Sequence, residues 1–175
     1  MASVSEILGT YSPEDVVVVI ANSEFSHVLN GYADGTFINI TREVPASTLY
    51  VGSDLSNARV VRGNKASTVT VSLHQASETN DVFSWVLSND ETTRDSTWTF
   101  SLTIKDNTGR SLWFSPQAFI SQEPDRAFST GIENRDWGIQ CVSLDGIAGG
   151  NGKYTPSTAA TITDLGGTVE PRWAP

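Results

Sequence analysis

Apolar and polar residues alternate in several short segments of this chain, and turn residues separate these segments. In residues 67–75, valine and leucine side chains fall on one face of an extended backbone, while threonine, serine and histidine fall on the other. Residues 97–105 repeat the pattern with large apolar side chains on one face: Trp98, Phe100, Leu102 and Ile104. Successive side chains of a strand point to opposite faces of a sheet, so both segments are predicted to be strands with one buried face.

Further strands are predicted where β-branched or aromatic runs lie between turn residues. Residues 15–22 form a valine-rich run that is too short for a typical buried helix. Asp106-Asn107-Thr108-Gly109 is typical of a hairpin turn. The other predicted strands or extended segments are residues 25–31, 36–43, 110–114, 118–122, 128–132, 137–144 and 159–163.

One segment has the period of a helix. Thr79-Asn80-Asp81 supplies capping side chains and a negative charge for a helix N-terminus. The apolar residues that follow have helical spacing: Val82, Phe83, Trp85, Val86 and Leu87. We predict a helix over about residues 80–89 that packs Phe83 and Trp85 against a sheet.

Many short strands with a single helix predict a mainly β protein, either a β-sandwich or a split barrel, and not alternating β–α units. The length of 175 residues predicts one domain, which we assign to residues 1–175. About residues 44–60 show neither period and lie between two predicted strands, so we predict one long inter-strand loop there. Loops of this length are uncommon in compact domains and are often functional.

Charge sets the same region apart. The chain has a formal net charge of −9, but residues 42–65 hold four basic side chains against two acidic ones. An acidic surface repels phosphate, which argues against a protein that reads nucleic acid. Elsewhere, two predicted strands share an uncharged hydroxyl face made by Thr70, Ser72, Thr99, Ser101 and Thr103. Such a face suits a smooth, wet surface, although the ordinary strand propensity of threonine explains it equally well.

The sequence shows no constellation for catalysis or for a cofactor. The two histidines, His27 and His74, lack the spacing of zinc ligands, and no nucleophile motif is present. The single cysteine, Cys141, lies in an apolar run and is predicted to be a small core residue. It excludes an intrachain disulfide, which favours a reducing compartment. We therefore predict no enzyme activity, no cofactor and no metal.

Three stretches of the chain carry a family resemblance. The first is GYADGTF at residues 31–37, continuing to residues 41–43. The second runs from residues 62–64 through VTVSLHQ at residues 69–75 to Ser77 and Asn80. The third joins residues 128–129 to ENRDWGIQC at residues 133–141 and to residues 149–151. In order and spacing, these stretches resemble the tail tube proteins of contractile-tailed bacteriophages.

The resemblance implies a β-sandwich or split barrel with one flanking helix and one long loop between strands. It implies that six copies form a ring, and that rings stack into a hollow inner tube through which DNA passes at ejection. The implied partners are other copies, the tail sheath protein, the tape measure protein, and baseplate and neck tube proteins. No sequence-specific DNA binding and no membrane anchor are implied. The implied location is the virion tail, after assembly in the host cytoplasm.

On this resemblance, the long loop is expected to reach the adjacent ring or subunit. Its expected apolar anchors are Leu49, Tyr50, Val51 and Leu55. The basic residues expected to meet an acidic surface, such as Glu78, Asp81 or Asp90, are Arg59, Arg62 and Lys65. The hydroxyl face is expected to line the lumen, where it would not bind phosphate.

Two other interpretations remain open. The chain also fits the inner-tube protein of a related contractile injection or secretion system. It also fits a carbohydrate-binding β-sandwich that stacks sugars on tryptophan, for which Trp113, Trp137 and Trp173 are the candidates because Trp85 and Trp98 fall on predicted core faces.

Overall fold

The structure is a computed structural model, and it describes residues 8–175. Within this range the strands are β1 (Val16–Ala21), β2 (Ser26–Val28), β3 (Ile38–Arg42), β4 (Ser47–Val51), β5 (Asn57–Val61), β6 (Ser67–His74), β7 (Phe100–Asp106), β8 (Leu112–Gln122), β9 (Asn134–Cys141) and β10 (Asp145–Ile147). The helices are α1 (Thr79–Thr93) and α2 (Pro156–Asp164), with 3-10 turns at Pro13–Asp15 and Pro171–Trp173. The prediction of a mainly β protein is therefore confirmed.

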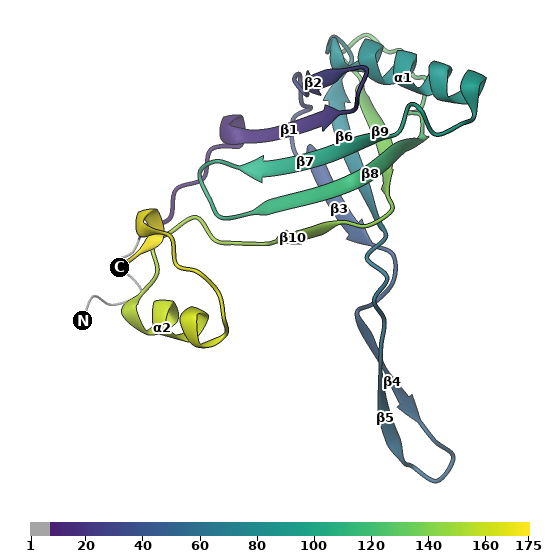
Figure 1. Ribbon diagram of the computed structural model, residues 1–175. Coiled ribbons are helices and arrows are strands. Elements are labelled where there is room, and N and C mark those ends of the chain that lie inside the picture. The colour runs from purple at the N-terminus through teal and green to yellow at the C-terminus, as the bar shows by residue number, and fades with distance from the viewer. Residues whose placement is uncertain (1–7) are drawn as a thin grey trace. The chain divides into compact units, whose positions relative to one another are not determined.

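Eight strands form one sheet, in which seven follow the order β2-β1-β7-β8-β9-β6-β3 and β10 pairs with β8 (Figure 1). The sheet does not close into a barrel, since β2 and β3 lie at opposite ends of this order. The chain divides into two compact units. The larger comprises residues 18–104 and 113–145, and the smaller comprises described residues in 8–17, 105–112 and 146–175.

The core of the larger unit follows from the alternation in its strands. Every second side chain of β6 and β7 is buried, as the sequence predicts. Neighbouring strands and α1 add the other members of this cluster, which include Val18, Ile20, Phe83, Val86, Ile120, Trp137 and Ile139. Cys141 is also fully buried in it, which confirms its predicted place as a core residue.

Helix α1 is longer than predicted, and one of its predicted contacts is wrong. Phe83 is fully buried and meets Trp137 edge-on, with ring centroids 5.3 Å apart. Trp85, in contrast, is 67% exposed. Residues two apart on a helix lie about 200° apart around its axis, so Phe83 and Trp85 cannot face the same sheet. The inward positions are those three apart, Phe83 and Val86.

Two segments predicted as strands are not strands. Residues 159–163 lie in α2, whose N-terminus is capped by the Thr155 hydroxyl, which accepts from the Thr158 amide at 3.2 Å. Residues 128–132 lie between β8 and β9 outside any described strand, and the side chains of Phe128 and Ile132 are 80% and 73% exposed. The two predicted segments at residues 110–114 and 118–122 belong to one strand, since β8 runs from Leu112 to Gln122.

The predicted loop over about residues 44–60 is instead a β-hairpin. Strands β4 and β5 pair with each other and form their own two-stranded sheet. Figure 1 shows this hairpin extending beyond the ends of β3 and β6, the two strands that it connects. The prediction of a long segment between two strands at this position is therefore confirmed. The prediction that it has no secondary structure is wrong.

In the smaller unit, polar and aromatic contacts hold the last residues of the chain. The Arg110 guanidinium lies 4.0 Å from the ring centroid of Tyr154 and 4.8 Å from that of Trp173. Asp106 is 7% exposed, and its carboxylate accepts from the Thr108 amide at 2.8 Å and from the Asn151 side chain at 2.7 Å. Among the helices of residues 8–175, none is long and apolar enough to cross a membrane.

Candidate assembly surfaces

The β4–β5 hairpin is organised by its turn. The Gly52 amide donates to the Ser56 carbonyl at 2.8 Å, and Leu55 adopts a positive φ of 66°. The Asp54 carboxylate accepts from the Ser56 amide at 3.0 Å, and hydrogen bonds from Ser56 hold the pKa of Asp54 below its ordinary value. A defined turn fixes the register of the two strands, in which Leu49 lies opposite Arg59 and Tyr50 opposite Ala58.

This register divides the hairpin side chains between two faces. We call one the basic face; it carries Ser47, Leu49, Val51, Asn57, Arg59 and Val61. We call the other the aromatic face; it carries Thr48, Tyr50, Ala58 and Val60. Large apolar side chains on both faces are exposed, including Leu49 at 72% and Tyr50 at 61%, and Leu55 at the tip is 78% exposed. The predicted apolar anchors are therefore all solvent-accessible in the single chain.

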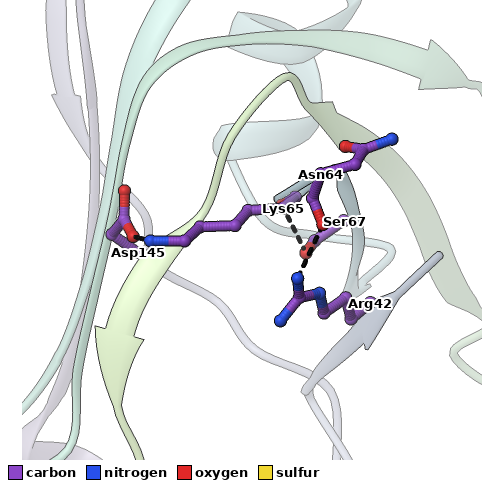
Figure 2. Close-up of polar contacts among 5 residues, drawn as sticks. All are labelled: Arg42, Asn64, Lys65, Ser67 and Asp145. Atoms are coloured by element: carbon purple, nitrogen blue, oxygen red, sulfur yellow. Dashed lines mark hydrogen bonds and ion pairs between the residues drawn. The ribbon is translucent and has the colours of Figure 1, made fainter. Parts of the chain in front are cut away.

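The base of the hairpin is fixed to the sheet by polar contacts (Figure 2). The Arg42 guanidinium donates to the Asn64 carbonyl at 2.6 Å. Lys65 forms an ion pair with Asp145, and its carbonyl accepts from the Ser67 hydroxyl at 3.1 Å. The Lys65 charge is therefore matched within its own chain. Among the described residues, neither Arg59 nor Arg62 forms an ion pair. Of the three predicted basic residues, these two therefore have charges available to a partner.

Four of the five predicted hydroxyl-face residues lie on the sheet and face away from the core, namely Thr70, Ser72, Ser101 and Thr103. Strands β6 and β7 are not neighbours, since β8 and β9 lie between them. The fifth residue, Thr99, precedes β7 and donates its hydroxyl to the Ser96 carbonyl at 2.9 Å. The structure thus places Thr99 in a turn, outside the strand.

Strand β9 contributes a part of this face that the sequence does not predict. Asp136 lies opposite Ser72, whose hydroxyl donates to its carboxylate at 2.5 Å. Gln140 lies opposite Thr68, whose hydroxyl donates to its side-chain oxygen at 3.2 Å. The alternation in residues 134–141 was the available signal, but sequence alone does not place β9 beside β6.

A second feature outside the sequence prediction is a groove of about 500 Å³ where β8 ends and β9 begins. We call it the acidic groove; it is lined by Gln122, Glu123, Asp125, Ala127, Ile132, Glu133, Asn134 and Asp136. Four of these eight residues carry carboxylates, and none is basic. Arg126 pairs with Glu123, and the Ser72 hydroxyl donates to Asp136. In residues 8–175, the carboxylates of Asp125 and Glu133 form no ion pair.

The tryptophans proposed for sugar stacking offer little ring surface. Trp137 is 3% exposed and donates its ring N–H to the Asn80 side chain at 2.9 Å. Trp173 is 7% exposed in the smaller unit. Trp113 is half-buried against the core. Stacking of a sugar needs an open ring face, which Trp137 and Trp173 lack.

Comparison with known proteins agrees with this picture of an assembling subunit. A family model described as the bacteriophage PhiTE tail tube protein matches residues 8–149. Structural protein ORF10 of Pseudomonas phage KPP10 is 40% identical over 166 residues, which cover 94% of this chain and 96% of that protein.

Two solved structures share the fold at low sequence identity. One is the tube-terminating cap of the anti-feeding prophage, with a TM-score of 0.51 and 11% identity over 84% of this chain and 99% of that one. The other comes from the sheath–tube complex of the PVC extracellular contractile injection system, with a TM-score of 0.52 and 13% identity over 85% of this chain and 99% of that one. At these identities the likeness concerns the fold alone. The family match and the phage relative together confirm the predicted resemblance: the chain belongs to the bacteriophage PhiTE tail tube protein family and is a structural subunit of an inner tail tube.

Proposed function

We propose that six copies of this chain form a ring, that rings stack into the inner tail tube, and that viral DNA leaves through its lumen. The observation that carries the proposal is an exposed apolar hairpin on a sheet whose ends, β2 and β3, have no further strand paired to them among the described residues. Unpaired sheet edges are a liability that closure into a ring removes. A head-to-tail contact of this kind gives a ring when its rotation closes. Residues 1–175 act together as a single tail-tube domain in this proposal.

The hairpin is the contact between rings or neighbouring subunits in this proposal. Its exposed Leu49, Tyr50, Val51 and Leu55 are the apolar anchors, and such side chains dominate interface energetics when they are buried centrally. Arg59 and Arg62 meet acidic surface on the next copy. Lys65 contributes at the base, where its ion pair with Asp145 orients the hairpin. The high net negative charge of the chain supports this pairing of a basic arm with its own acidic copies.

The lumen is lined by the sheet face that carries Thr70, Ser72, Ser101 and Thr103, with Thr99 at its margin. Asp136 adds negative charge to the same face. DNA binding requires basic groups that replace counterions on phosphates, so an acidic and hydroxyl-rich wall leaves DNA free to slide. The face therefore serves passage and not recognition.

The chain is a phage structural protein, and its place is the virion. In our proposal it assembles in the host cytoplasm, within the tail sheath protein and around the tape measure protein, and it meets baseplate and neck tube proteins at its two ends. It acts without catalysis. The phage relative favours a phage tail over a related injection or secretion system.

Negative-stain electron microscopy of the purified chain tests the proposal. We expect six-fold rings or hollow tubes at high protein concentration. A matched sample carrying Arg59→Glu and Arg62→Glu is expected to form fewer and shorter tubes, and to lose more of them as salt rises. A chain that remains monomeric even when open-ended tube fragments are added as seeds would refute the function. Normal tubes from the charge-reversed chain would refute only the role of the two arginines.

A further inference from the structure

Both faces of the hairpin expose large apolar side chains, which is unusual for a two-stranded sheet in water. The basic face exposes Leu49 and Val61 at 72% and 67%, and the aromatic face exposes Tyr50 and Val60 at 61% and 42%. An antiparallel sheet with one solvated face normally alternates apolar and polar side chains. An isolated two-stranded hairpin is marginally stable at best in water, so this one gains little from its own contacts.

A hairpin that lies flat on one partner surface buries one face and leaves the other in water. Burial of apolar surface contributes about 25 cal/mol per Å², so a face left exposed forgoes that stabilisation. The second face also enlarges the exposed apolar surface of the subunit, and such patches mark interaction sites. Exposed apolar side chains on both faces therefore fit an arm that is covered on both sides.

We propose that each hairpin is held between two other copies of the chain, with the basic face on one copy and the aromatic face on the other. This inference rests on the proposed function. It adds that one hairpin contacts two neighbouring copies. A hairpin that joins two copies links three subunits, so each ring-to-ring contact also ties neighbouring subunits to one another.

The two faces differ in charge, which assigns them different partner surfaces. The basic face carries Arg59 beside Leu49 and Val61, whereas the aromatic face carries no charged residue within β4 and β5. The acidic groove offers the complement to the basic face, because it combines the unpaired carboxylates of Asp125 and Glu133 with the 73% exposed side chain of Ile132. The aromatic face meets a surface outside this groove, and its contact is independent of charge.

Photo-crosslinking tests the assignment directly. A benzoylphenylalanine is placed at position 49 in one sample and at position 50 in another, and each variant is assembled into tubes with isotope-labelled wild-type chain. We expect position 49 to crosslink to labelled peptides from residues 122–136, and position 50 to crosslink to a different labelled region. Capture of the same region from both positions, or capture from only one of them, would overturn the two-sided arrangement.

Charge variants give a second, independent test. Arg59→Glu is expected to raise the protein concentration needed for tube assembly at least tenfold at low salt, with a smaller effect at high salt. Tyr50→Ser is expected to raise it by a similar factor at both salt concentrations. Lys153→Glu, an exposed site outside the hairpin with the same change of charge, serves as the matched control and should assemble as the wild type does. Equal salt dependence of the Arg59 and Tyr50 variants would contradict different partner surfaces.

The outcomes separate this inference from the proposed function. If no condition yields rings or tubes, the proposed function fails and this inference fails with it. If tubes form but both hairpin faces report one surface, only the two-sided arrangement is refuted.

Discussion

Removing the hairpin should abolish assembly without destabilising the subunit. The perturbation replaces residues 46–62 with Gly-Ser-Gly and keeps Arg42, Asn64 and Lys65, so that the polar contacts at the base remain. The hairpin pairs only with itself among the described strands, and its large side chains are exposed. Its loss should therefore remove little that stabilises the single chain.

The expected change in stability follows from loop closure. Strands β3 and β6 pair through to Arg42 and Ser67, so about 24 residues lie between the paired ends in the native chain. The replacement shortens this connection to about 10 residues, and the cost of loop closure falls by about 0.8 kcal/mol. With a denaturant slope of about 2 kcal/mol/M, the urea midpoint should rise by about 0.4 M.

Urea unfolding followed by tryptophan fluorescence measures this change, at a concentration where sedimentation shows only monomer. Electron microscopy of the same preparation at high concentration then measures assembly. A loss of more than about 2 kcal/mol would mean that the hairpin packs against its own subunit, because a solvent-exposed hairpin contributes little stability. Normal tubes from the shortened chain would refute the role of the hairpin in assembly.

Three further predictions concern the core, the smaller unit and the lumen. Phe83→Ala should lower the free energy of unfolding by about 3–5 kcal/mol, because it empties a fully buried site between α1 and the sheet, and Phe83→Leu should lower it less. Burial raises the pKa of Asp106, but hydrogen bonds from Thr108 and Asn151 outweigh it and hold the pKa below its ordinary value. A depressed folded-state pKa adds stability above the unfolded-state pKa of about 4, and this stability is lost as the pH falls through the folded-state pKa. Asp106→Asn should therefore lower the free energy of unfolding by about 1–3 kcal/mol at pH 7. In urea unfolding below pH 4, the variant should lose stability less steeply than the wild type. Parallel pH profiles of the two proteins would contradict the sign of the pKa shift. Tubes of Thr70→Lys should retain a labelled DNA duplex at low salt and release it at high salt, while wild-type tubes retain none; absence of retention would place Thr70 outside the lumen.

The sequence predicts the sheet well where one face is buried. In β6 and β7 the apolar side chains recur at every second position and pack on a single core, so pattern and burial agree. The hairpin gives a weaker signal because apolar side chains lie on both of its faces: STLYV shows no alternation, and NARVV alternates only over its first four residues. A period-two pattern reports a difference between two environments, and in the single chain both faces of the hairpin meet the same solvent.

The other errors have separate causes. Trp85 and Phe83 both lie in an apolar helical run, and only the direction of the sheet decides which one is buried. Residues 159–163 are rich in threonine, yet Thr161 and Thr163 donate their hydroxyls to backbone carbonyls four residues earlier, at 3.0 Å each, and remain helical. The acidic groove draws its residues from the end of β8, the start of β9 and the segment between them, where no periodic pattern indicates how the chain folds.

The open sheet bears on how a ring would form. If copies pair edge to edge between β2 and β3, every incomplete arc ends in two free edges, whatever its length. Each added copy forms one new edge-to-edge contact, except the last copy, which forms two. The last copy loses only as much translational and rotational freedom as each earlier one. Ring formation is then cooperative: free subunits and complete rings dominate the population, and arcs of intermediate size stay rare. The two unpaired edges of one chain's sheet thereby favour complete rings over partial ones.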